Sequence, residues 1–259
     1  MKRVLIGSPI HQEPEILSYY LSSLQDLNTE GIEVSYCFVD DNRSVESKDL
    51  LKAFKQEHSA KILKSYHKDT YIRTEETHLW KEELIWKVAD FKNQIIQEAL
   101  KGKYDYLLFV DSDLVLHPQT LQTLIKSKRD IISEIFWTKW ELNSIPLPQV
   151  WVKDQYTLFH QKRGEKIDQQ GAQQRAMNFL KQLKKPGVYE VGGLGALTLI
   201  SKKAIEAGVS FKEIKNVSFS GEDRHFCIRA MALGFSLYVD THYPATHLYR
   251  SSDVEQLRK

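Results

Sequence analysis

The first half of the chain alternates short apolar runs with longer segments in which apolar residues recur every three or four positions. The short runs predict buried strands at residues 4–6, 34–39, 61–63 and 104–110. Segments with helical spacing lie between them, at residues 13–24, 45–54 and 82–100. Strands that alternate with helices in this way predict a parallel sheet with helices on its faces, and right-handed crossovers then give a Rossmann-like half. Gly102 follows the third helix, where we expect a C-cap.

The second half of the chain is less regular. We expect strands at residues 130–137, 149–152 and 235–239, and a helix at 221–233. The polar segment 160–185, rich in Gln and Lys, predicts a mobile loop, a surface helix or both, and a lid is the alternative. No repeat or Pro/Gly-rich linker interrupts the chain, so we expect one domain over 1–259, with halves at about 1–116 and about 117–259.

Composition and charge narrow the class of protein. The 259 residues are 42% hydrophobic, which is enough for a core and excludes a disordered chain. Lys and Arg number 36 against 34 Asp and Glu, a net charge of +2, so we expect no nucleic-acid partner. Two isolated cysteines, Cys37 and Cys227, indicate free thiols. No apolar run is long enough for a membrane span or a signal peptide, so we expect a cytoplasmic protein, with peripheral membrane contact left open.

Two of the predicted strands end in acidic residues. Asp40 and Asp41 follow the second strand, and Asp111 and Asp113 flank Ser112 after the fourth. Ligands of open parallel sheets bind outside the carboxyl ends of the strands, so both groups fall at the expected functional edge. Two carboxylates two residues apart can bind Mg²⁺ or Mn²⁺ and leave positions open for diphosphate oxygens and water. A solvated turn with an N-capping aspartate is the alternative.

Other candidate residues lie in the second half. Glu222 and Asp223 begin a predicted helix, where a carboxylate is either a helix cap or a base that accepts a proton from an acceptor hydroxyl. Three glycines within residues 192–195 indicate either tight packing or room for a sugar against the backbone. His247 becomes a metal ligand only if the chain folds back toward Asp113. Three tryptophans either pack in the core or stack on sugars of an acceptor: Trp137, Trp140 and Trp151.

The ordered set of these features resembles one family, the GT-A type glycosyltransferases, and among them family 2. The resemblance rests on the motifs VDDNRS at 39–44, FKN at 91–93, LFVDSD at 108–113, GG at 192–193 and GEDRHFCIRA at 221–230, with His247 beyond them. It implies an α/β fold of the GT-A type: a Rossmann-like nucleotide-binding half with a mostly parallel sheet, and a smaller mixed region on the acceptor side. Residues 130–132 and 191–193 also resemble GT-A enzymes that synthesise mannan.

The resemblance also implies roles for individual residues. Asp113 would bind a divalent metal, Mn²⁺ or Mg²⁺, with His247 as a second ligand. Asp223 would be the general base of an inverting displacement, with Glu222 as second choice. The donor would be a UDP- or GDP-sugar and the acceptor a carbohydrate or another hydroxyl compound. Seven residues would bind the nucleotide sugar: Pro9, Asp40, Asp41, Lys92, Asp111, Ser112 and Gly193.

Two departures from the family pattern limit the interpretation. Lys92 stands where arginine is common, so contacts to the nucleobase can differ. The family's Gln-x-x-Arg-Trp motif is absent, which argues against a processive synthase.

A nucleotidyltransferase is a competing hypothesis, although residues 7–13 are not basic as a triphosphate loop would be. A non-catalytic sugar- or nucleotide-binding module on a degenerate GT-A fold is another. An assay for turnover separates these readings.

Overall fold

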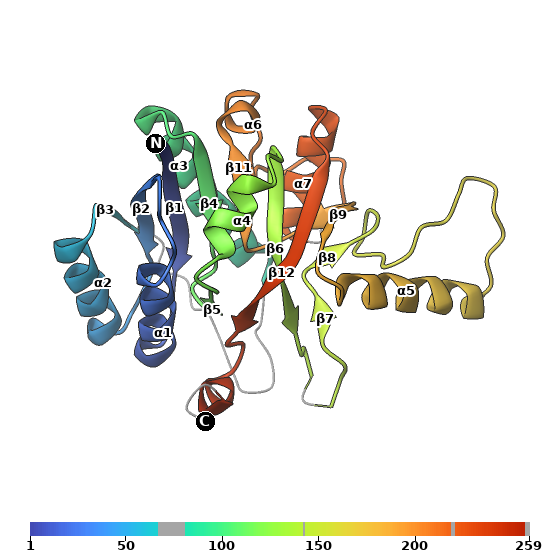
Figure 1. The fold of residues 1–259 in the computed structure, drawn as a ribbon, viewed down its shortest axis with the longest axis horizontal. Coiled ribbons are helices and arrows are strands. Elements are labelled where there is room, and N and C mark those ends of the chain that lie inside the picture. The colour runs from blue at the N-terminus through green and yellow to red at the C-terminus, as the bar shows by residue number, and fades with distance from the viewer. Residues whose placement is uncertain (67–80, 142, 219–220, 257–259) are drawn as a thin grey trace.

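A computed structural model describes residues 1–66, 81–141, 143–218 and 221–256 of the chain. Most strands of this part form one large sheet, in the order β3-β2-β1-β4-β11-β6-β12-β5, with β7 beside β6 and β9 beside β12 (Figure 1). Their bounds are β1 Lys2–Ile10, β2 Ile32–Asp40, β3 Ala60–Lys64, β4 Tyr106–Phe109, β5 Leu114–Val115, β6 Ile131–Thr138, β7 Leu147–Pro148, β9 Val188–Val191, β11 Thr198–Ser201 and β12 Leu237–His247. A separate antiparallel pair is made by β8 Val150–Trp151 and β10 Gly193–Leu194.

The sheet is parallel in its first half and mixed in its second. Strand β1 pairs in parallel with β2 and β4, and β2 pairs in parallel with β3. Strand β11 then runs antiparallel to both β4 and β6, while β12 returns parallel to β6. The predicted α/β fold, with a mostly parallel central sheet and a mixed region beyond it, is confirmed.

Helices cover both faces of the sheet (Figure 1). Helices α1, α2 and α4 pack on one face around Tyr20, Phe38 and Leu108. Helices α3, α6 and α7 pack on the other face around Ile95, Phe109 and Phe226. The helices are α1 Pro14–Gln25, α2 Val45–Glu57, α3 Glu82–Gly102, α4 Thr120–Lys126, α5 Gln169–Leu183, α6 Lys202–Glu206 and α7 Glu222–Ala232, followed by a 3₁₀ turn, η1 Ser251–Gln256.

Several elements differ from the sequence prediction. Gly102 is the last residue of α3, and Lys103 is the C-cap residue with a left-handed φ of 54°, so the prediction for Gly102 was wrong. Strand β12 continues to His247, well past the predicted 235–239, through a shift of register between Asp240 and Ala245. The 160–185 segment contains a helix, α5, that extends away from the sheet (Figure 1).

Cys37 and Cys227 are both buried free thiols, as the sequence indicated. Among the helices that the structure describes, none combines the length and the apolar character that a membrane span requires.

Candidate active site

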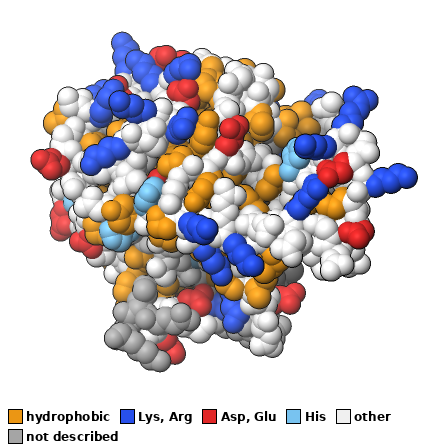
Figure 2. Space-filling view, turned by 45° about the vertical axis from the view of Figure 1, so that its right-hand side comes forward, with side chains coloured by type: hydrophobic (Ala, Val, Ile, Leu, Met, Phe, Trp, Pro, Cys, Tyr) orange, Lys and Arg blue, Asp and Glu red, His pale blue; other side chains and the backbone are white. Residues whose placement is uncertain are grey.

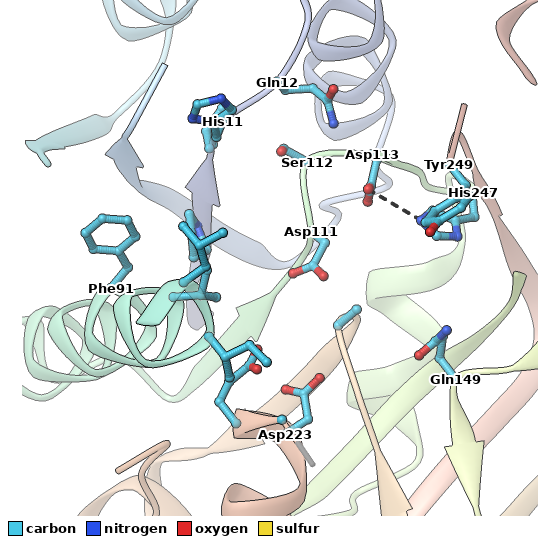
Figure 3. Close-up of a pocket in the computed structure, with 18 of the residues that line it drawn as sticks. His11, Gln12, Phe91, Asp111, Ser112, Asp113, Gln149, Asp223, His247 and Tyr249 are labelled. Carbon is cyan, nitrogen blue, oxygen red and sulfur yellow. Dashed lines mark ion pairs between the residues drawn. The ribbon is translucent and has the colours of Figure 1, made fainter. Parts of the chain in front are cut away.

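A cavity of about 400 Å³ opens where the carboxyl ends of β1 and β4 meet the start of α7 and the end of β12 (Figure 3). The buried face of α3 forms one wall, with Leu84, Lys87 and Phe91. Strands that end at the same edge of a parallel sheet place the residues that follow them side by side. Segments from both halves of the chain therefore contribute to one site.

Eight of the eleven predicted site residues line this cavity: Pro9, Asp41, Asp111, Ser112, Asp113, Glu222, Asp223 and His247. Three do not, namely Asp40, Lys92 and Gly193. Asp40 Oδ1 accepts hydrogen bonds from the backbone N and the side-chain Nδ2 of Asn42, at 3.0 and 2.8 Å, and so shapes the turn after β2. Gly193 lies under Trp151, since a Cβ there would be 1.9 Å from the indole ring.

Asp41 is held by two basic side chains at one wall of the cavity. Lys87 Nζ lies 2.7 Å from Asp41 Oδ2, and His11 Nδ1 lies 3.4 Å from the same oxygen. Burial favours the neutral acid, but hydrogen bonds from His11 and Lys87 outweigh it and bring the pKa of Asp41 down to about 2. Asp41 is therefore a fixed carboxylate, and the Lys87 charge is already neutralised.

The acidic motif after β4 points into the middle of the cavity (Figure 3). Burial raises the pKa of Asp111 to about 7 against the attraction of Lys92, and the neighbouring Asp113 raises it further. Asp113 Oδ2 lies 3.4 Å from His247 Nε2. The His247 ring is oriented by its other nitrogen, because Nδ1 and Thr138 Oγ1 share a hydrogen bond of 2.9 Å. The fold thus brings the end of β12 back to the acidic motif.

Lys92 is buried behind Glu222 and Asp223 rather than exposed to the cavity. Its Nζ lies 2.8 Å from Glu222 Oε1 and 3.0 Å from Asp223 Oδ1. Burial raises the pKa of Asp223 to about 6, while Lys92 and a hydrogen bond from the backbone N–H of Ala196 lower it. In Figure 3, the Asp223 carboxylate points toward the same space as Asp111.

Aromatic side chains also line the cavity. Tyr156, Trp140 and Tyr249 all line it, whereas Trp151 is buried beneath Tyr156 with a ring separation of 4.5 Å. Tyr156 has a left-handed backbone, with φ of 55°. A tyrosine held in that conformation indicates that the surrounding turn fixes its position at the cavity.

Sequence reasoning missed several residues that line the cavity: His11, Lys87, Gln149, Tyr156 and Tyr249. A signal was present for Lys87. It lies three residues after Leu84 and four before Phe91, on the apolar stripe of α3, where a charged residue indicates a buried ion pair. No comparable signal marks Tyr156, because its place depends on the conformation of an irregular loop.

Comparison with known proteins identifies relatives of this chain. The Anp1 family model matches residues 1–149. A glycosyltransferase 25 family member from Aedes aegypti is 29% identical over 140 residues, which are 51% of this chain and 23% of that protein. The chain therefore spans less than a quarter of the length of that curated relative.

Two solved proteins share the fold across nearly the whole chain. The mannosyltransferase PcManGT from Pyrobaculum calidifontis, solved with GDP-Man and Mn²⁺, aligns with a TM-score of 0.57 and 10% identity, over 99% of this chain and 59% of that one. TarS 1–349 from S. aureus aligns with a TM-score of 0.55 and 15% identity, over 95% of this chain and 60% of that one. TarS in complex with UDP-GlcNAc aligns with a TM-score of 0.52 and 15% identity, over 95% of this chain and 58% of that one.

Identities this low are evidence of fold alone, and the shared fold is that of the GT-A glycosyltransferases. The family model is stronger evidence, since it matches more than half of the residues and includes β1, β2 and the acidic motif after β4. The chain belongs to the Anp1 family and has the GT-A fold.

Proposed function

We propose that this chain is a metal-dependent glycosyltransferase that moves a sugar from a nucleoside-diphosphate sugar to an acceptor hydroxyl, with inversion at the anomeric carbon. The observation that carries the proposal is the convergence of Asp111, Asp113, Asp223 and His247 in one cavity at the carboxyl edge of the sheet. Relatives with the same fold were solved with GDP-Man and with UDP-GlcNAc, which supports a nucleotide sugar as donor.

The charge of the cavity supports a divalent metal. Its lining includes one lysine, Lys87, against five carboxylates: Asp41, Asp111, Asp113, Glu222 and Asp223. A diphosphate brings more negative charge into this space, so a bound cation is needed to offset the repulsion. The shared fold with a Mn²⁺-containing mannosyltransferase agrees with this requirement.

Asp113 and His247 fit such a cation as ligands. Their side chains present an oxygen and a nitrogen 3.4 Å apart, and the Thr138 hydrogen bond orients the imidazole. No group of three or more His, Cys, Asp or Glu side chains in the described residues is arranged to hold a metal alone. Mg²⁺ and Mn²⁺ sites with one or two protein ligands take the rest from substrate phosphates and water. When bound, the metal would neutralise the charge that develops on the leaving diphosphate.

Asp223 is the general base in this proposal. Its carboxylate accepts the proton of the acceptor hydroxyl as that oxygen bonds to the anomeric carbon, and the bond from this carbon to the diphosphate oxygen breaks on the opposite face. With a pKa of about 6, Asp223 is ionised at neutral pH and still basic enough to take the proton. Glu222, whose Oε1 accepts a hydrogen bond from Lys92 at 2.8 Å, is the second choice.

The donor would lie between β1 and the acidic motif. Pro9, Asp41 and Ser112 line that side, with Asp111 beneath the sugar. The acceptor would enter past the aromatic side chains of Tyr156 and Trp140, which are exposed to 45% and 43%. Aromatic faces of this kind stack on sugar rings.

Two substitutions test the proposal. Asp113→Ala should remove Mn²⁺-dependent binding of the donor nucleotide, and Asp223→Asn should keep that binding but lose transfer. Binding is measured by thermal shift with UDP, GDP, CMP and dTDP compounds, each with and without Mn²⁺, and transfer by release of the nucleoside diphosphate. Normal turnover by Asp223→Asn would show that the base is another residue. Mn²⁺-dependent binding without any turnover by the wild type would instead indicate a non-catalytic module.

A further inference from the structure

Lys92 is one of the most deeply buried charges in the described part of the molecule, with a side chain exposed to only 3%. It comes from the middle of α3, and its Nζ lies 4.9 Å from the centre of the Phe211 ring. A buried ammonium is costly unless it is paired, and here two carboxylates pair with it. Both carboxylates belong to the first turn of α7.

This arrangement fixes Asp223 from two directions. Lys92 Nζ donates to Asp223 Oδ1 at 3.0 Å, and the backbone N–H of Ala196 donates to the same carboxylate. Gly195 leaves the space, because a Cβ at that position would lie 2.8 Å from Asp223 Oδ2. The Asp223 carboxylate therefore has little freedom to rotate away from the cavity.

The charged and titratable groups around Asp223 come from four directions. Lys92 faces it from α3, Asp111 from the loop after β4, and Tyr156 from the loop after β8. Glu222 and Cys227 face it from its own helix. Among these groups Lys92 is the only cation, and the other four are neutral or negative. Removing the ammonium therefore leaves Asp223 with no cation among these groups, and only the hydrogen bond from the Ala196 N–H still favours its charge.

We propose that Lys92 is a positioning residue for the base rather than a donor-binding residue. Its ammonium holds Asp223 ionised and directed into the cavity, and the same ammonium also pairs with Glu222. The inference rests on the proposed function, in which Asp223 is the base. It changes the role expected for Lys92 from the family resemblance, which was contact with the nucleotide sugar. Two distances of 2.8 and 3.0 Å to the carboxylates carry it.

The test compares Lys92→Met, Lys92→Arg and Glu222→Gln with the wild-type chain, and Lys87→Met is the matched control. Lys87 lies on the same helix and is equally buried, but its partner is Asp41. Three quantities are measured: the pH profile of kcat/KM for transfer, the Kd of the nucleoside diphosphate with Mn²⁺, and the titration of the Asp223 carboxyl carbon by NMR. Asp223→Asn assigns that NMR signal.

In Lys92→Met, the acid limb of the profile and the NMR midpoint should both move up by about one pH unit or more, because the attraction that favours the carboxylate is gone. Lys92→Arg should restore the midpoint, since it keeps the charge. Glu222→Gln should move the midpoint down, because the Glu222 charge that disfavours the Asp223 carboxylate is removed and Lys92 then pairs with Asp223 alone. Lys87→Met should leave the midpoint in place, and the Kd of the nucleotide should not change in any Lys92 variant.

An unchanged midpoint in Lys92→Met overturns the proposal, and so does a weaker Kd without a pH shift, which would make Lys92 a donor-binding residue. If Lys92→Met does not fold, Lys92→Gln, whose uncharged amide keeps a polar side chain in the buried site, takes its place, and an unchanged midpoint in that variant overturns the proposal. Failure of the proposed function has a different signature. In that case the wild type transfers no sugar, while the NMR midpoint still responds to Lys92→Met.

Discussion

At the residue scale, the three glycines within residues 192–195 make room for other atoms of the protein. A Cβ on Gly192 would lie 1.9 Å from the Val152 carbonyl oxygen, and one on Gly193 equally close to the Trp151 ring. Gly195 faces Asp223. The sequence left two readings open, packing or room for a sugar. All three glycines pack closely against other residues, and the residue that packs against Gly195 is the proposed base, Asp223.

Gly195→Ala should therefore impair transfer more than it impairs folding. The new methyl group displaces Asp223 Oδ2, and a shift of about 1 Å in a reacting group costs on the order of a hundredfold in rate. We expect kcat to fall by about tenfold to a hundredfold, measured beside the unfolding free energy in urea.

Gly208→Ala is the control for this substitution. Gly208 has φ of +97° with nothing within 4 Å of a built Cβ, so alanine there costs about 1 kcal/mol of stability through backbone strain alone. Its kcat should equal that of the wild type. Equal loss of activity in both variants would contradict the role assigned to Gly195.

Glu134 supplies a prediction that does not involve the candidate active site. It lies fully buried beside Asp240 of the paired strand, and burial together with the Asp240 charge raises the pKa of Glu134 to about 9 from 4.5. Between those two pH values the folded chain keeps a proton that the unfolded chain has released, so stability falls as pH rises.

Glu134→Gln removes this dependence. Relative to wild type, the unfolding free energy of the variant should rise by about 1.4 kcal/mol per pH unit, or up to about 4 kcal/mol from pH 5 to pH 8. Urea titrations at four or five pH values measure the difference. Parallel stability curves for the two chains would show that Glu134 is ionised in the folded state.

At the scale of elements, α3 contributes most to the site, and the sequence did not predict the ion pairs of its buried lysines. Its apolar stripe was evident in the sequence, and the helix runs from Glu82 to Gly102. The two lysines that it buries, Lys87 and Lys92, serve as counter-charges for Asp41 and for the carboxylates of α7. The helix thus forms one wall of the cavity and also contributes two buried lysines that pair with carboxylates of the site.

The C-terminus of α3 gives a prediction of its own. Lys103 adopts a left-handed φ of 54°, which costs a residue with a side chain more than it costs glycine. Lys103→Gly should stabilise the chain by about 0.5–1 kcal/mol. Lys101→Gly, two residues earlier and inside the helix, should destabilise it by about 1 kcal/mol. Thermal unfolding of both variants checks the pair, and destabilisation by Lys103→Gly would contradict it.

Elements with strong periodicity could be predicted from the sequence, and those shaped by distant contacts could not. Strands β1, β2 and β4 and helices α1 and α3 are apolar at the right intervals, so their existence follows from local pattern. The extension of β12 to His247 depends on pairing with β6, across a register shift that no local pattern encodes. The ion pairs of Lys92 likewise join residues 130 and 131 positions apart. Resemblance to a family named eight residues that line one cavity, but it assigned Lys92 to the nucleotide sugar, whereas the structure buries Lys92 in an ion pair with Glu222 and Asp223.

At the scale of the whole molecule, the cavity joins the two halves of the chain. Its walls come from residues 9–12 and 111–113 in the first half and from residues 221–223, His247 and Tyr249 in the second. A ligand in this space contacts both halves at once, so its binding free energy stabilises their association.

Hydrogen exchange can detect this coupling. A nucleoside diphosphate with Mn²⁺ should slow amide exchange in residues 9–12, 111–113, 221–223 and 247–249 together. Strand β3, at the far edge of the sheet, should exchange at an unchanged rate. Protection of the first two segments without the last two would show that the nucleotide binds to the first half alone.

The order of strands in the sheet has a consequence for synthesis of the chain. Strands β4 and β6 both pair with β11, which follows the end of β6 by about 60 residues. At translation rates of roughly 5–20 residues per second, β6 waits roughly 3–12 s for that partner. During this interval the growing chain carries an unpaired edge on β4, at Leu107 and Leu108, and lacks both main partners of β6, whose Ile131 and Ile132 are fully buried once folding is complete. The antiparallel strand that joins β4 to β6 therefore also sets how long these apolar edges stay open to aggregation in the nascent protein.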